Sequence, residues 1–159
     1  MRLKLAMGLA LLTAGFFAVA PRAVAQEGHP LSGSWYGEWG KDAEQVTFIM
    51  KWDDKERDKG GKVVTDPDGK ERPVIGRDGK PVFAVRGMFN PGPNSSIATM
   101  TLDSAKWMVH IETDYKDDDG KVTHIVADGK LETMGSYNRT IKGTWTQGNA
   151  KGDFKLRRD

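Results

Sequence analysis

The sequence contains no cysteine, and this absence restricts both its stability and its chemistry. Disulfide bonds, thiolate metal sites and cysteine nucleophiles are excluded, so in an oxidising compartment the fold must rely on packing alone. Common catalytic signatures are missing as well. There is no Gly-x-Ser-x-Gly motif, no glycine loop of the P-loop type and no His-Glu-x-x-His motif. These absences favour a non-catalytic function.

Only one long apolar run occurs, and it lies at the start of the chain. Arg2 and Lys4 precede the uncharged apolar run at 5–20, and the small-x-small sequence Ala23-Val24-Ala25 follows it. This order is typical of a secretion signal cleaved before Gln26. A membrane-spanning helix needs about 20 apolar residues, which is more than this run offers. We therefore expect a periplasmic or extracellular protein whose mature chain has no membrane span.

An excess of charge of one sign is also absent once the signal is removed. The full chain carries 24 basic and 22 acidic residues. Cleavage after residue 25 removes three basic residues and no acidic ones, which leaves a mature chain of 134 residues with a net charge of −1. The basic character that would favour nucleic acid as a partner therefore disappears. A chain of this length fits one domain with its own core.

The mature chain shows no long 3.6-residue apolar period, but several short segments alternate apolar and polar residues. Such alternation, ended by glycine, aspartate, asparagine or proline, predicts β-strands. The expected strands lie at 33–40, 45–52, 82–89, 96–103, 107–115, 122–127, 140–147 and 152–157. A segment at 131–134 could extend the sixth of these past a turn or bulge at Asp128-Gly129.

The connections predict antiparallel neighbours. Short polar loops at 117–120 and 148–151 are typical of β-hairpins. The segment 53–81 is the exception, because it is rich in Lys, Asp, Gly and Pro and repeats the unit Asp-Gly-Lys at 68–70 and 78–80. We interpret it as an insertion, either a solvated loop or an element that extends the flanking strands or covers a barrel mouth, in which 63–64 and 73–75 could pair.

The strand count and spacing predict an all-β domain at 26–159. An antiparallel up-and-down barrel of about eight strands is the favoured architecture, because closure removes exposed strand edges. A β-sandwich is the alternative fold. A barrel of this size either holds one small ligand or is filled by its own side chains.

Two Gly-x-Trp motifs stand near the ends of the mature chain. Gly33-Ser34-Trp35 resembles the motif that opens the first strand of lipocalins, and with Tyr36 it is similar to the first strand of avidin-type barrels. Together with Gly-Thr-Trp-Thr-Gln-Gly at 143–148, it also resembles an uncharacterised β-rich region found ahead of some secreted bacterial serine hydrolases. These resemblances cover only the two ends of the chain and imply a small exported β-barrel.

A barrel rich in aromatic residues suggests an apolar ligand site. The candidate ligand-binding residues are Trp35, Tyr36, Phe83, Trp107 and Trp145. The alternative is that the tryptophans of the Gly-x-Trp motifs are simply core aromatics.

One group of polar residues could support chemistry. His110 and Glu112 share a face of one expected strand, and His124 lies on the next. A hairpin centred on 117 would place His124 opposite His110, and one centred on 118 would place it opposite Glu112. The three could bind zinc or another divalent metal, or form an acid–base pair. The alternative is a solvated outer face.

Three functions remain open. The favoured hypothesis is an exported, non-catalytic binding module for a small apolar or amphipathic ligand. The second is a protein-interaction or inhibitor domain that docks on an exported enzyme, with 53–81 as the docking element. The third is a metal-dependent or acid–base enzyme using His110, Glu112 and His124. No cofactor is indicated by the sequence.

Overall fold

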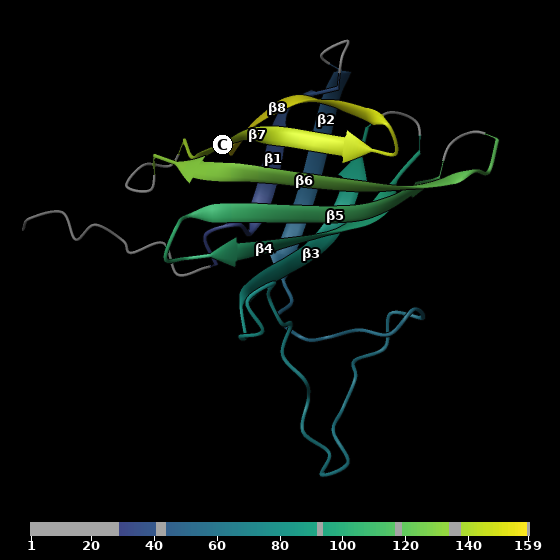
Figure 1. Cartoon of the computed structure of the whole chain (residues 1–159), viewed down its shortest axis with the longest axis vertical. Helices are drawn as coiled ribbons and strands as arrows, with labels where there is room; N and C mark the ends of the chain where they lie inside the picture. Colours follow the sequence, from purple (N-terminus) through teal and green to yellow (C-terminus); the bar gives the residue numbers. More distant parts are fainter. Residues whose placement is uncertain (1–28, 41–43, 92–93, 117–118, 134–137, 159) are drawn as a thin grey trace, which may run out of the picture.

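A computed structural model describes residues 29–40, 44–91, 94–116, 119–133 and 138–158. The predicted secretion signal at 1–25 and its cleavage site lie outside the described residues. The described chain contains no helix and forms eight strands (Figure 1). These are β1 (Gly33–Trp39), β2 (Glu44–Trp52), β3 (Phe83–Asn90), β4 (Ser96–Asp103), β5 (Met108–Lys116), β6 (Val122–Glu132), β7 (Thr140–Gln147) and β8 (Ala150–Arg158).

The strands form a closed antiparallel barrel in simple sequence order. Each strand pairs with the next, and β8 returns to pair with β1 from Trp35↔Arg158 to Trp39↔Phe154. This arrangement confirms the predicted all-β, up-and-down barrel of eight strands. Closure pairs the two strands that would otherwise be edges, which removes a site of unwanted strand addition.

Two of the sequence expectations for the connections need correction. β6 runs without interruption through Asp128 and Gly129, so the expected turn or bulge at this point is wrong. Gly129 is required for packing instead, because a Cβ there would lie 2.8 Å from the ring of Phe154. The loop between β7 and β8 is shorter than expected: Gln147 pairs directly with Ala150, and only two residues connect the strands.

The barrel interior is filled by side chains from all eight strands. Trp39 lies at the centre of an aromatic cluster, with ring centroids 4.9 Å from Phe154, 5.6 Å from Phe89 and 6.2 Å from Trp145. Phe48 and Phe89 stack at 4.5 Å. Aliphatic side chains of the other strands complete one continuous core. Burial of this apolar surface is the main stabilising term of the fold.

A short segment ahead of β1 covers one end of the barrel. Leu31 is fully buried there, and its carbonyl accepts a hydrogen bond of 2.8 Å from Trp35 Nε1. The carbonyl of Pro30 accepts one of 3.0 Å from Arg139, which ties the segment to the strand β7 region. His29 is also buried in this segment.

The insertion, residues 53–82, leaves the barrel between β2 and β3 and extends away from it (Figure 1). It is not a structureless loop, because three of its segments are joined in a ring of backbone hydrogen bonds. Val64 N donates to Glu56 O, Arg72 N donates to Val64 O, and Glu56 N donates to Arg72 O, at 2.8 to 3.0 Å. The expected pairing of 63–64 with 73–75 is wrong, because Val63 pairs with Arg57, Pro73 with Lys55 and Ile75 with Pro81.

Three turns of the same design connect the segments of the insertion. Each ends in a glycine followed by a lysine, at 61–62, 69–70 and 79–80. The turns begin at Asp58, Asp66 and Gly76. In each one, the backbone N–H of this first residue donates to the carbonyl of the lysine, and its carbonyl accepts a hydrogen bond from the N–H of the glycine, at 2.8 to 3.0 Å. The repeat seen in the sequence at 68–70 and 78–80 therefore has a third, less obvious member, which begins at Asp58.

Candidate binding surface on the outer wall

The aromatic residues proposed for ligand binding do not lie together. Trp35 and Trp145 are buried in the barrel interior. Tyr36, Phe83 and Trp107 are exposed on the surface. The two tryptophans of the Gly-x-Trp motifs are thus core residues, which is the alternative that the sequence left open.

The strand register separates the two histidines proposed as metal ligands. His110 pairs with Asp128, and His124 pairs with Asp114. Both registers expected from the sequence, with His124 opposite His110 or opposite Glu112, are therefore wrong. The hairpin is centred on position 119, beyond both expected centres. When the hairpin centre moves by one residue, the cross-strand partner of each residue moves by two positions, so every pair between β5 and β6 changes.

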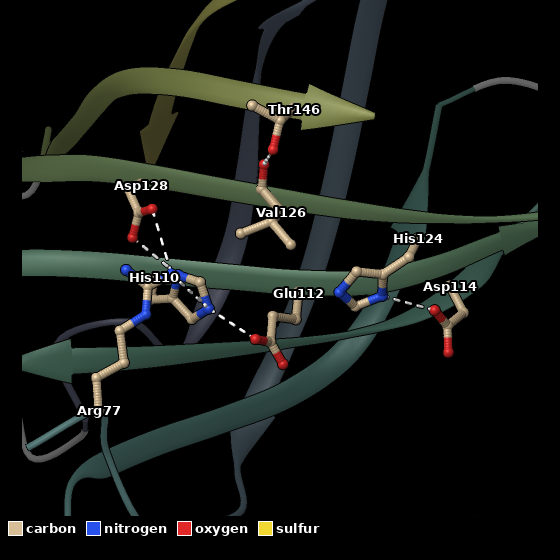
Figure 2. A network of polar contacts seen from close by, with 8 residues as sticks. All are labelled: Arg77, His110, Glu112, Asp114, His124, Val126, Asp128 and Thr146. Carbon is tan, nitrogen blue, oxygen red and sulfur yellow. Dashed lines mark hydrogen bonds and ion pairs between the residues drawn. The ribbon is translucent and has the colours of Figure 1, made fainter. Parts of the chain in front are cut away.

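His110 is instead the centre of a polar network on the outer face of β5 and β6 (Figure 2). Its Nδ1 lies 2.8 Å from Asp128 Oδ1, and its Nε2 lies 2.8 Å from Glu112 Oε1. Arg77, from the third turn of the insertion, brings Nη2 to 3.0 Å from His110 Nδ1 and 3.4 Å from Asp128 Oδ2. The network therefore joins the insertion to the barrel wall.

The chemistry of this network suits a latch. His110 places one ring nitrogen against each of two carboxylates, Nδ1 against Asp128 and Nε2 against Glu112. Arg77 brings a guanidinium group to one of these carboxylates, Asp128, at 3.4 Å. Because the insertion supplies only Arg77, the contact of this side chain with His110 and Asp128 fixes the third turn against β5 and β6.

His124 takes part in a separate ion pair. Its Nδ1 lies 2.8 Å from Asp114 Oδ1, and both side chains are exposed. Within the part of the chain that the structure describes, no group of three or more His, Asp or Glu side chains is arranged to hold a metal ion. Figure 2 shows the two histidine networks next to each other on the same wall.

A groove of about 720 Å³ lies between the base of the insertion and the outer wall of β2, β3 and β4. We call it the insertion groove. Trp52 and Ile97 provide apolar surface, and each is 58% exposed. Its other lining residues are mainly charged or glycine: Lys51, Asp53, Arg57, Asp58, Lys59, Gly60, Gly61, Arg86 and Gly87.

Asp53 organises the wall of the insertion groove. Its Oδ2 accepts a hydrogen bond of 2.6 Å from Arg57 Nε, and Arg57 Nη1 donates to the carbonyl of Gly61 at 2.7 Å. These bonds hold the first turn of the insertion over the groove. Arg86 Nε lies 3.7 Å from the same Asp53 oxygen, beyond hydrogen-bond distance, and has no hydrogen-bond partner among the described residues.

An apolar row crosses the wall beside the groove. Ile49, Met88 and Ile97 are direct neighbours across β2, β3 and β4, and all three point outward and are exposed. Adjacent outward positions normally carry polar residues in a barrel whose interior is apolar. Exposed apolar side chains that gather next to a groove indicate a contact surface.

The insertion groove was not found from the sequence, although one signal was present. Ile49 alternates with Thr47 and Lys51, so the pattern placed an apolar residue on the polar face of its strand. Met88 and Ile97 are likewise apolar residues on the polar faces of their strands, and together the three positions indicate an apolar outer wall. Only the fold shows that these positions adjoin each other and the base of the insertion.

The buried histidine was also missed. His29 is 3% exposed, and its ring lies 5.8 Å from that of Trp52 and 5.7 Å from that of Phe83. Its Nδ1 accepts a hydrogen bond of 3.1 Å from Leu31 N, but Nε2 is buried with no partner among the described residues. Burial lowers the pKa of His29 to about 4, against a smaller opposing effect of Asp54. The ring is therefore neutral at pH 7.

No family model, curated protein or solved structure matches the chain. The described residues also contain no helix long and apolar enough to cross a membrane.

Proposed function

We propose that this protein is an exported, non-catalytic binding module that binds its partner on the outside of the barrel, at the insertion groove. The observation that carries the proposal is the contrast between the two candidate locations. The interior is packed with aromatic and aliphatic side chains, while an open groove of about 720 Å³ lies outside, at the base of the insertion. A binding site needs a concave surface with apolar and polar groups, and the groove offers both.

The partner we propose is another exported protein rather than a small apolar ligand. Three features of the outer surface support this choice. The insertion extends well beyond the barrel (Figure 1). It contacts the wall through Asp53, which lies 3.7 Å from Arg86 of β3, and through Arg77, which lies 3.4 Å from Asp128 of β6. The apolar row continues the contact area beyond the groove, as protein interfaces require. The secretion signal predicted at 1–25 supports an exported protein.

The test is site-specific photocrosslinking in the native host. A photoreactive amino acid replaces Ile97, which lines the groove, or Lys59, which lies on its rim. Lys151 and Lys155, on β8, serve as control positions because β8 is four strands away from β4 around the barrel. We expect a discrete adduct of higher mass from the groove positions and none from the controls.

Native mass spectrometry of the protein purified from its secreting host separates the alternatives. A polypeptide of bare mass, together with groove-specific adducts to one protein, supports the proposal. A bound small molecule that disappears on denaturation, without groove-specific adducts, would overturn it in favour of a carrier.

A further inference from the structure

We infer that the insertion groove binds an acidic, extended segment of the partner that also carries an apolar residue. This inference depends on the proposed function, because it specifies the occupant of the same groove. It rests on the charges, the pairing and the exposed apolar groups that line the groove.

Positive charge exceeds negative charge along the groove. Four of the lining residues are Lys or Arg and two are Asp. Both carboxylates already have donors within the protein. Asp53 accepts from Arg57, and Asp58 accepts from the backbone N–H groups of Gly60 and Lys62, each at 2.9 Å. A ligand therefore meets carboxylates that are already satisfied.

The lysines and arginines of the groove have fewer partners within the protein. Arg57 is committed to Asp53 and to a backbone carbonyl, but Arg86 reaches Asp53 only at 3.7 Å. No carboxylate among the described residues forms an ion pair with Lys51 or Lys59. The two lysines can thus accept new carboxylate partners, and Arg86 adds positive charge to the wall beside them. Charge-assisted hydrogen bonds to carboxylates are among the stronger polar contacts.

The apolar groups of the groove indicate that its ligand carries an apolar group as well as negative charge. Trp52 and Ile97 are each 58% exposed at the groove, and an exposed indole is a frequent anchor in protein interfaces. Gly60 and Gly61 carry no side chains that would block a peptide backbone. A chain with carboxylates on either side of one aliphatic or aromatic residue complements both kinds of group.

The experiment selects ligands without assuming their sequence. A displayed library of random peptides is selected on the full protein. The groove variant K51Q/K59Q/R86Q tests the site of binding. The control variant K151Q/K155Q/R157Q removes the same number and types of cation from β8, on the other side of the barrel. Circular dichroism and melting temperature establish that both variants are folded.

We expect enriched peptides with a clear excess of Glu and Asp around one apolar residue. A synthetic copy should bind the groove variant at least about tenfold more weakly than the wild type and the control variant equally well. Replacing its acidic residues with Gln should weaken it by a similar factor, and added salt should weaken it further.

The outcomes distinguish this inference from the function on which it depends. Enriched peptides that require the groove but carry no acidic excess would overturn the inference and leave the groove as the binding site. Failure to enrich any peptide, or enrichment of peptides that ignore the groove variant, would overturn the inference too. In either case, groove-specific crosslinks to one protein would show that the proposed function survives.

Discussion

The buried histidine makes the stability of this protein sensitive to mild acid. In the folded state the pKa of His29 is about 4, compared with 6.5 for an unperturbed ring. Between these two values the unfolded chain binds a proton that the folded chain excludes. Stability is therefore complete above pH 6.5 and is lost progressively as the pH falls toward 4. One pKa unit corresponds to about 1.4 kcal/mol, so the total loss is about 3 kcal/mol.

That loss is large compared with the total stability of a typical domain, about 5 to 15 kcal/mol. It is measured by urea unfolding of the wild type and the His29→Phe variant at several pH values from 7 to 4.5. The phenyl ring can occupy the space between Trp52 and Phe83 but cannot bind a proton. We expect a steep decline in unfolding free energy for the wild type and a shallower one for the variant.

The comparison isolates His29 because both proteins retain His110, His124 and every carboxylate. The difference between the two curves is the contribution of His29 alone. Parallel curves would refute the reasoning, as would a His29 pKa near 6.5 measured by NMR. Either result would mean that the segment covering the barrel end admits water or a charge-balancing group.

Three further predictions concern the core, the latch and the metal hypothesis. Trp39→Ala should lower the free energy of unfolding by about 3 to 5 kcal/mol, measured by urea denaturation, because it removes the centre of the aromatic cluster; a change below about 1 kcal/mol would contradict the packing described. Arg77→Gln should speed hydrogen exchange of the amides at 76–82 without lowering the melting temperature, whereas Arg157→Gln should change neither; equal exchange in both variants would argue against the latch. The double exchange of His110 and His124 for Gln should leave the metal content and the groove-specific crosslinks unchanged, and loss of a bound metal in elemental analysis would restore the metal hypothesis.

The strands were predictable because their alternation follows directly from the burial of one face. In β2 the pattern assigns Val46, Phe48 and Met50 to one side, and all three are buried in the core. Trp52 has the same parity but is 58% exposed, because it lies at the end of the strand, where the barrel opens. Alternation thus gives the direction of a side chain but not its distance from the mouth of the barrel.

The register of β5 and β6 was not predictable for a specific reason. The turn contains three consecutive aspartates at 117–119 followed by Gly120, and several of these positions suit a hairpin centre equally well. The apolar residues of both strands alternate with period two, so shifts by two positions keep the interior apolar. Only the outer polar pairs, such as His124 with Asp114, distinguish the registers, and their energies are small because they are exposed.

The groove was hidden from the sequence because its parts come from separate segments. Ile97 lies in β4, after the Asn-Pro-Gly-Pro segment at 90–93 that ends the preceding strand pattern. Arg86 lies in β3, and Arg57 belongs to the insertion. The pairing of β3 with β4 brings Arg86 and Ile97 to the same wall, and the bond from Arg57 to Asp53 places the first turn of the insertion beside them. A filled barrel has no room for a ligand among its core side chains, and a sequence alone does not distinguish a filled barrel from a hollow one, because both require apolar residues inside. The apolar residues that do distinguish them are those outside. Ile49, Met88 and Ile97 contribute nothing to the core, and their alignment beside Lys51 and Arg86 of the groove wall is explained if a partner covers them.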